Sequence, residues 1–458
     1  MKVMKFGGGC LKDSKHFLIV AEIIKAEKDS AVVIVSAMSG VTNLLEDGIQ
    51  MSMESEKNVS EIIKTIRDKH KDIAEALIRN DDIKHRTLEE IEVRLKKLEK
   101  LFYGVTYTGE ITESVKANIL SYGERLSAIM LSGVLKSLGK DAIAMEADQI
   151  GIITDESFEN ATAMLPEASK NLRSEVLPLV RRGAIPVITG YFGCTLEGKI
   201  TTFGRNGSDY SAAVVANGIG SSLLEIWKDV EGFMSADPKI VECPHRIDKL
   251  SYYEAAELSY FGAKIIHPRT VEPLVHIRVP IHIRNLYEPE SEGTEVLPGG
   301  YEREDVIKSV TYNKHISILR IHGPGVGYKP GIIAEIGRLL SDMEINIYSV
   351  ITSQTCINLL IGKNDSRKSY ESIKKLADGV IEKVNLENNI ALIAVVGEGL
   401  LKRKGVISRV FSAVAEEDIN IEMISLGASE VACYFIVIED DVEKAINAIH
   451  REFFKEIK

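Results

Sequence analysis

Cysteine is scarce in this chain of 458 residues, and the five that occur lie far apart in the sequence. They are Cys10, Cys194, Cys243, Cys356 and Cys433. An odd number of cysteines without any CxxC pair argues against a disulfide framework and against a zinc site. We therefore expect free thiols and no metal ion held by a set of protein side chains.

Long apolar runs and an excess of positive charge are also missing. No stretch reaches the eighteen apolar residues that suggest a membrane-spanning helix, and the formal net charge is −11 at pH 7. An acidic protein is a poor partner for a nucleic-acid backbone. The chain passes from Met1-Lys2 directly into a short apolar strand, without the apolar region of a secretory signal. These features predict a cytoplasmic protein without membrane or nucleic-acid partners.

Two common catalytic signatures are absent as well. The sequence has no GxxxxGK followed by Ser or Thr, which argues against a P-loop NTPase. It also has no constellation of His and Cys residues that would indicate a nucleophile with its general base.

What is present at the N-terminus is an alternation of strands and helices. Residues 2–6 are a predicted strand that ends in three glycines, and residues 13–28 show the apolar spacing of a helix. Residues 31–35 are a β-branched run typical of a buried parallel strand, followed by a polar loop over 36–43. This order predicts a doubly wound α/β sheet, with ligands bound at the loops that follow the strands.

The stretch 201–212 contains the densest group of chemically active residues. Arg205 lies between glycines, and Ser208-Asp209 precedes an apolar run that predicts a helix. Ser and Asp suit a helix start, where free N–H groups and the helix dipole favour an anion. The stretch is suited to position a carboxylate or a phosphate. A charged surface loop capped onto a helix is the plainer alternative.

The middle of the chain predicts further helices and the end of the sheet. Residues 44–101 contain no strand-like run and are expected to be a helical insertion. Residues 120–138 are expected to be another helix, with Glu124 near its beginning. Residues 280–285 are predicted to be the last strand, and the Pro/Gly/Glu-rich residues 288–300 a linker.

After the linker the sequence repeats itself. The segment from Gly331 to Ile347 lies over that from Gly405 to Ile421 without a gap. Each copy predicts a βαββα unit, which forms a small antiparallel sheet with helices on one face. Neither copy has a cluster of catalytic side chains, so we expect a ligand-binding or assembly module.

Five short motifs occur in order along the chain. They are Lys5-Phe6-Gly7-Gly8, Ser36-Ala37-Met38-Ser39-Gly40-Val41-Thr42-Asn43, Gly204-Arg205-x-Gly207-Ser208-Asp209-Tyr210-Ser211-Ala212, Asp229-Val230-x-Gly232-x5-Pro238 and Phe261-Gly262-Ala263-Lys264. Together they resemble aspartate kinase, and the repeat resembles a tandem pair of ACT domains, over essentially the whole chain. The resemblance implies an amino acid kinase domain at 1–300 and ferredoxin-like ACT domains at 312–385 and 388–458. Because no homoserine dehydrogenase-like extension follows, a monofunctional enzyme is expected.

The activity that the resemblance implies is ATP-dependent phosphorylation of the β-carboxylate of L-aspartate, the first step of aspartate-family amino-acid biosynthesis. A carboxylate nucleophile is ionised at neutral pH, so the reaction needs no general base. It needs alignment of the reactants and neutralisation of the charge on the phosphoryl group. Mg²⁺ is expected with ATP, held largely by phosphates and water.

Residue roles follow from the same resemblance. The implied catalytic residues are Lys5, Arg205, Asp209 and Lys264. The implied substrate-binding residues are Ser36, Thr42, Glu124, Arg205, Asn206, Gly207 and Ser208. The implied nucleotide-binding residues are Lys5, Phe6, Gly7, Gly8, Lys228, Asp229, Met234, Lys239, Lys264 and Ile265. Lys5 would be the transition-state lysine, Arg205 suits a bidentate grip on the α-carboxylate, and Glu124 would pair with the α-ammonium.

Some of these residues also have plainer interpretations. Lys5 could be a solvated lysine at a strand end, Asp209 a helix cap, and Lys264 a structural ion-pair partner. Position alone favours a surface carboxylate for Glu124. His267 is interpreted as a packed histidine before a proline rather than as a catalyst.

The chain departs from the family pattern at several positions near the nucleotide. They are Gly9-Cys10 where Thr-Ser is usual, Asn206 where Gly is usual, Lys228 for Thr, Met234 for Tyr and Lys239 for Arg. These departures leave the charged catalytic set intact and bear on nucleotide affinity.

The ACT-like pair implies feedback by threonine or lysine, bound between modules of two subunits, and hence a homodimer or homotetramer. Candidate contacts are residues 329–333 and 346–353. Tyr348 replaces an aspartate of lysine-responsive relatives, which favours threonine.

Two alternatives from the sequence remain open. One is a kinase for another amino-acid carboxylate, such as glutamate; the C-terminal repeat and Glu124 argue against it. The other is a non-catalytic or specialised paralogue that senses an amino acid on the same scaffold. Retention of the four implied catalytic residues argues against the sensor.

Overall fold

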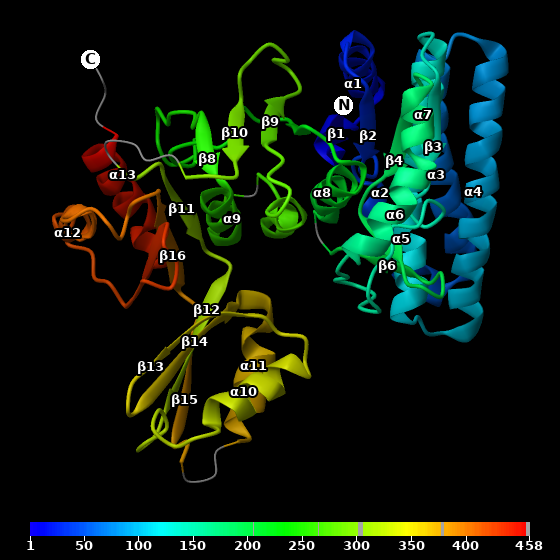
Figure 1. Ribbon diagram of the computed structural model, residues 1–458. Helices are drawn as coiled ribbons and strands as arrows, with labels where there is room; N and C mark the ends of the chain where they lie inside the picture. The colour runs from blue at the N-terminus through cyan, green and yellow to red at the C-terminus, as the bar shows by residue number, and fades with distance from the viewer. Residues whose placement is uncertain (205, 264, 301–305, 377–379, 455–458) are drawn as a thin grey trace. The chain divides into compact units, whose positions relative to one another are not determined.

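The computed structural model describes residues 1–204, 206–263, 265–300, 306–376 and 380–454, and the chain divides into two compact units (Figure 1). The first unit comprises Met1–Phe233, Arg246–Ala256 and Lys264–Gly300. The second comprises Met234–His245, Glu257–Ala263 and Tyr301–Lys458. None of the helices in the described ranges combines the length and apolarity that crossing a bilayer requires.

The first unit is built on one eight-stranded sheet. Its strands, in spatial order, are β3 Ala142–Met145, β4 Ile185–Thr189, β2 Ala31–Val35, β1 Lys2–Phe6, β7 Leu224–Lys228, β9 Ile281–Asn285, β10 Thr294–Leu297 and β8 Lys249–Ser251. The strands from β3 to β9 pair in parallel, and most of their β-branched residues are buried. Val32, Val33, Ile34 and Val35 of β2 are fully inaccessible. The predicted doubly wound α/β fold is confirmed.

The predicted end of this sheet is wrong. The strand at 280–285 is β9, but β10 follows inside the segment expected to be a linker and pairs antiparallel with β9. β8 then pairs with β10. β10 alternates in burial, with Thr294 and Val296 fully buried. A strand of four residues among Pro and Gly is too short to show this alternation in the sequence.

Helices and a small ribbon complete the first unit. Its helices are α1 Ser14–Ala26, α2 Val41–Glu54, α3 Glu56–Leu77, α4 Asp81–Thr108, α5 Glu113–Ser137, α6 Leu165–Glu175, α7 Leu177–Arg181 and α8 Gly207–Ile219, with the 3₁₀ turns η1 Gly8–Cys10 and η2 Pro268–Leu274. The ribbon consists of β5 Phe192–Cys194 and β6 Ile200–Thr202. Helix α9, Tyr252–Phe261, has residues in both units.

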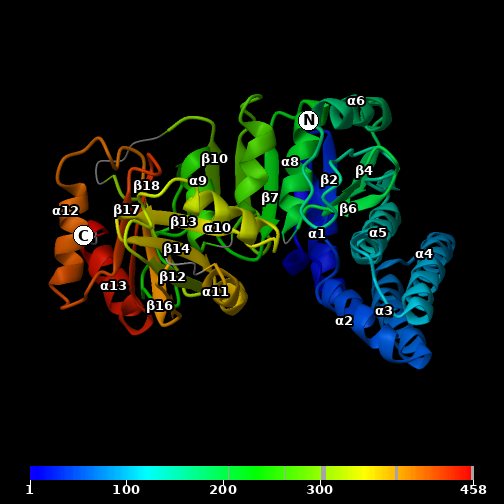
Figure 2. The same cartoon turned by 90° about the horizontal axis from the view of Figure 1, so that it is seen from below.

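The helical insertion predicted over 44–101 is confirmed, because α2, α3 and α4 occupy this segment and lie to one side of the sheet (Figure 2). The helix predicted to start near residue 120 begins earlier, at Glu113, where Thr112 accepts a hydrogen bond from the Val115 N–H. Glu124 therefore lies in the middle of α5 rather than near its beginning. The first turns of α5 are polar, which hid the true start.

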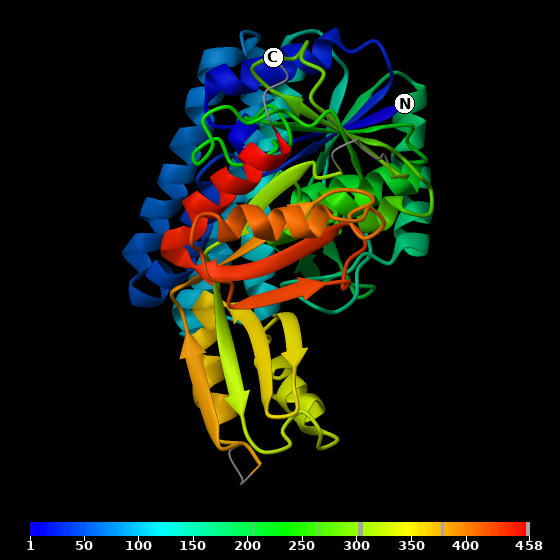
Figure 3. The ribbon, with the colours of Figure 1, turned by 90° about the vertical axis from the view of Figure 1, so that its left-hand side faces the viewer.

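The second unit contains the predicted repeat. The first copy is β12 Ile316–His322, α10 Ile332–Ser341, β13 Ile347–Thr352, β14 Cys356–Gly362 and α11 Ser366–Lys374, with η3 Lys363–Asp365. The second is β16 Ile390–Val396, α12 Val406–Ala415, β17 Met423–Leu426, β18 Ala432–Ile438 and α13 Val442–Phe453, with η4 Glu439–Asp441. Both are βαββα units with an antiparallel sheet (Figure 3), as predicted.

The two copies also exchange strands. β11, Ser309–Asn313, precedes the first copy but pairs with β16 of the second. β15, Lys383–Glu387, precedes the second copy but pairs with β12 of the first. The sheets therefore have the orders β13-β14-β12-β15 and β11-β16-β18-β17. Each sheet is completed by the strand that leads into the other copy.

Candidate active site

Four parallel strands of the first unit end at one edge of the sheet. The register aligns Phe6 of β1 with both Val35 of β2 and Trp227 of β7, and Val35 with Thr189 of β4. The glycine turn after β1, the loop after β2 and the loop after β7 therefore leave the same edge. This is the edge at which α/β folds of this kind bind ligands.

A buried cluster of charges lies at this edge. Lys5 Nζ lies 2.5 Å from one carboxylate oxygen of Asp209, and Lys228 Nζ donates a hydrogen bond of 3.1 Å to the other. Asp209 is 0% exposed and Lys5 is 3% exposed. Lys228, one of the departures from the family pattern, thus supplies a second cation to the same carboxylate. Asp209 is a partner of two lysines rather than a surface cap.

The pKa values of Asp209 and Lys5 depend on the charges next to them. Burial alone would raise the pKa of Asp209, but Lys228 and Lys5 lower that pKa to about 2. Burial lowers the pKa of Lys5, and the Asp209 carboxylate opposes that change. The Asp209 carboxyl is therefore ionised at neutral pH, with a lysine side chain on each of its oxygens.

The turn before α8 brings Asp209 and Ser208 to this edge. Asn206 adopts the left-handed conformation, with φ of 59°, and α8 begins at the next residue, Gly207. Asn tolerates this conformation better than most residues, so it can replace the usual glycine. Ser208 packs against Gly190 in the loop after β4, because a Cβ on that glycine would lie 2.8 Å from Ser208 Cβ.

The glycine turn after β1 leaves little room for side chains. A Cβ on Gly7 would lie 3.3 Å from Lys5 Nζ, and one on Gly8 would lie 3.2 Å from the Ala37 carbonyl oxygen. Both contacts are tighter than nine in ten real Cβ contacts. The turn therefore keeps its backbone close to the Lys5 ammonium, as a phosphate-binding loop requires.

Glu124 is the second buried carboxylate near this edge. It is 4% exposed; Oε1 accepts the Ala37 N–H at 2.9 Å, and buried Oε2 has no hydrogen-bond partner among the described residues. Burial raises the pKa of Glu124 to about 8, although the Ala37 hydrogen bond and the Lys5 charge act in the opposite direction. A buried carboxylate with one free oxygen fits a cationic ligand group. The surface position favoured by sequence position alone is wrong.

The loop after β2 is fixed next to Glu124. Ser36 donates its backbone N–H to the Phe6 carbonyl at 3.1 Å, and Met38 donates its N–H to Ser127 Oγ at 2.9 Å. Ser36 and Thr42 are both half-buried. Their predicted substrate-binding roles stay predictions.

The structure does not assign the remaining predicted site residues to the charged cluster. Arg205 and Lys264 lie outside the described residues. Met234 and Lys239 belong to the second unit, where the Met234 carbonyl accepts a hydrogen bond from Ser309 Oγ. Ile265 and His267 are in the first unit, and His267 accepts the Arg269 N–H, which agrees with a packed, helix-capping histidine.

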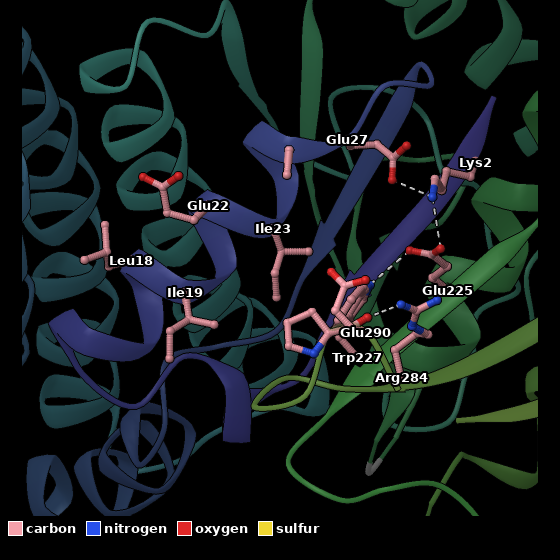
Figure 4. A pocket seen from close by; sticks show the side chains of 12 residues that line it. Lys2, Leu18, Ile19, Glu22, Ile23, Glu27, Glu225, Trp227, Arg284 and Glu290 are labelled. Atoms are coloured by element: carbon pink, nitrogen blue, oxygen red, sulfur yellow. Dashed lines mark hydrogen bonds and ion pairs between the residues drawn. The ribbon is translucent and has the colours of Figure 1, made fainter. Parts of the chain in front are cut away.

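A groove of about 580 Å³ lies elsewhere on the sheet (Figure 4). It is lined by Lys2, Glu225 and Trp227, together with residues of α1. Side chains alternate along a strand, so Lys2 and Lys5 project from opposite faces of β1. Lys2 is already paired with Glu27 and Glu225. The groove is therefore separate from the charged cluster.

One ion pair next to the glycine turn was not found from the sequence. Lys12 Nζ donates a hydrogen bond of 3.1 Å to Asp229 in the loop after β7, 217 residues away. Cys10 Sγ donates to the Trp227 carbonyl at 3.2 Å. Lys12 stands just after the departure Gly9-Cys10, and this departure was the only available signal.

Known proteins resemble the chain over its whole length. A family model described as the amino acid kinase family matches residues 1–285, and one described as an ACT domain matches residues 393–453. Aspartokinase 1 of Arabidopsis thaliana, a chloroplastic protein, is 30% identical over 99% of this chain and 80% of its own length. The chain belongs to the aspartokinases of the amino acid kinase family. The resemblance predicted from the motifs is confirmed.

Solved aspartokinases share the fold. The structure of E. coli aspartokinase III in complex with aspartate and ADP has a TM-score of 0.86 and is 27% identical, covering 99% of this chain and 100% of that one. The same enzyme in complex with lysine and aspartate has a TM-score of 0.82. The chain spans 56% of the bifunctional aspartokinase/homoserine dehydrogenase of Buchnera aphidicola, at 28% identity.

The charged cluster predicts a large stability effect at Asp209. Asp209→Asn leaves buried Lys5 without a counter-charge, so we expect the free energy of unfolding to fall by about 3 to 5 kcal/mol in urea denaturation. Asp229→Asn is the matched control, because its ion pair is exposed and a loss of at most about 1 kcal/mol is expected. Equal losses in the two variants would contradict the buried cluster.

Proposed function

We propose that this chain transfers the γ-phosphoryl group of ATP to the β-carboxylate of L-aspartate and releases 4-phospho-L-aspartate and ADP. The observation that supports this proposal most strongly is the buried cluster of Lys5, Asp209 and Lys228 beside the glycine turn. The cluster holds two lysine side chains at the strand ends, where the phosphates of ATP would bind. E. coli aspartokinase III, similar over its full length, binds aspartate and ADP.

In the proposed reaction, an oxygen of the β-carboxylate attacks the γ-phosphorus as the bond to the β-phosphate oxygen breaks. No proton is transferred, because the attacking carboxylate is already ionised. The chain contributes alignment and positive charge. Lys5 neutralises charge on the moving phosphoryl group, and Asp209 holds the Lys5 and Lys228 ammonium groups in place. Arg205 and Lys264 keep their predicted roles within this proposal.

Recognition of the aspartate α-ammonium is assigned to Glu124. Its buried carboxylate has one oxygen without a described partner, and the nearby loop fixes the other oxygen. An ammonium group beside Oε2 would offset the free-energy cost of burying a charged carboxylate. It would therefore favour the ionised form of Glu124. Selectivity for an α-amino acid follows from the cost of leaving the carboxylate unpaired.

Further parts of the proposal concern cofactor, regulation and assembly. Mg²⁺ would enter with ATP and be coordinated mainly by phosphate oxygens and water. The tandem ACT-like repeat would bind an amino-acid effector, threonine or lysine, between subunits of a homodimer or homotetramer. One structure of E. coli aspartokinase III is a complex with lysine. In this chain, Tyr348 favours threonine as the effector. The cytoplasmic location stays a prediction from the sequence.

Trapping the acyl phosphate tests the proposed function. Purified protein is incubated with Mg-ATP, L-aspartate and hydroxylamine, and in a parallel reaction with L-glutamate. We expect aspartyl hydroxamate, and at least tenfold less product from glutamate, because one additional methylene group would move the attacking carboxylate out of alignment with the γ-phosphorus. Glutamyl hydroxamate alone would support the other carboxylate kinase, and binding without any product would support the amino-acid sensor. Adding threonine or lysine to the same reaction identifies the effector.

The pKa of Glu124 predicts how aspartate affinity depends on pH. In the free protein this carboxyl is protonated below about pH 8, whereas the proposed complex needs it ionised. Each pH unit between 6 and 8 should therefore lower the KM for aspartate up to tenfold, and the KM should level off near pH 8.

The matched variants are Glu124→Gln and Glu113→Gln, two substitutions on the same helix. Glu113 is exposed in the first turn of α5, so Glu113→Gln should keep the profile of the unmodified protein. Glu124→Gln should bind aspartate at least tenfold more weakly and without this slope. A flat profile for the unmodified protein would remove Glu124 from the substrate site.

A further inference from the structure

The space next to residue 9 is filled from another part of the chain. A Cβ on Gly9 would lie 2.9 Å from one carboxylate oxygen of Asp229 and 3.1 Å from its Cγ. Real Cβ atoms essentially never show the shorter of these distances. The Asp229 carboxylate therefore occupies the place that a side chain on residue 9 would take.

Lys12 holds the Asp229 carboxylate in that place. The ion pair of 3.1 Å joins the segment after the glycine turn to the loop after β7. Cys10 Sγ donates to the Trp227 carbonyl, which links the same segment to the end of β7 itself. Partial burial alone would raise the pKa of Asp229, but the hydrogen bond from Lys12, a backbone hydrogen bond and the charges of Lys12 and Lys228 together lower that pKa. The residue before Asp229 is Lys228, the last of β7, which donates to Asp209.

We propose that Lys12 is a positioning residue for the nucleotide: its ion pair with Asp229 holds the loop after β7 against the glycine turn, in place of the side chain that Gly9 lacks. The inference rests on the part of the proposed function that puts the nucleotide at these two loops. Lys12 acts through Asp229, so its loss changes nucleotide affinity and leaves the chemical step and aspartate binding in place.

The size of the effect follows from the exposure of the pair. The side chains of Lys12 and Asp229 are 40% and 41% exposed. Ion pairs with this exposure stabilise a structure much less than buried pairs do, and salt screens them. A small, salt-dependent change in nucleotide affinity is therefore the expected signature, and a loss of folding is not expected.

The test measures the Kd of Mg-ADP by isothermal titration calorimetry on the full chain. Lys12→Met should raise the Kd about two- to fivefold at low ionic strength, and the difference should shrink in about 0.5 M KCl. The KM for ATP should rise by the same factor, with kcat and the KM for aspartate unchanged. Lys12→Arg, which keeps the charge, should return the Kd to within twofold of the original value.

Two further variants make the test specific. Lys15→Met removes the same charge from an exposed position three residues away and should leave the Kd unchanged. Gly9→Ala should displace Asp229 and raise the Kd, and combining it with Lys12→Met should add little, because both changes break one contact.

An unchanged Kd in Lys12→Met, an equal rise in Lys15→Met, or failure of Lys12→Arg to recover the affinity would overturn the inference. The titration needs no turnover, so this result is separate from that of the hydroxamate test. Weaker Mg-ADP binding in Lys12→Met, without any aspartyl hydroxamate from the unmodified protein, would retain the positioning role and reject the aspartate kinase activity.

Discussion

The arrangement of the first unit depends on one buried interaction, the carboxylate of Asp209 between the ammonium groups of Lys5 and Lys228. The three residues come from the first strand, the start of α8 and the end of β7. Desolvating three charges costs free energy that only close mutual contact can offset. The strand ends and the helix start must therefore stay in register for the unit to be stable.

This constraint also makes the site chemically useful. Because Asp209 holds Lys5 beside a glycine turn without side chains, the amino group of Lys5 is already in place before any ligand arrives. A preorganised cation stabilises developing charge at no cost of reorganisation. Glu124, on the same edge, has a buried oxygen with no described partner. The edge thus offers lysine side chains for an anion, and a buried carboxyl group that an ammonium group would ionise.

The sequence was sufficient for local elements and for residues in short motifs. Lys5 and Asp209 were predicted because each stands in a motif next to a strand or helix start. The repeat was predicted from its gapless pattern. Contacts between distant parts of the chain could not be predicted from local sequence patterns. The Lys12–Asp229 pair joins residues 217 positions apart. The exchange of β11 and β15 depends on how strands pair. The burial of Glu124 was missed because the polar start of α5 disguised its length.

The proposed activity depends on Lys5, whose ammonium group would neutralise charge on the transferring phosphoryl group. The most direct measurement is the kcat of Lys5→Met with Mg-ATP and L-aspartate, alongside urea denaturation of the same variant. Methionine has a similar length without the charge, so the account predicts a loss of about 10³-fold in kcat with a cooperative unfolding transition retained. A kcat within tenfold of the unmodified protein would contradict the account.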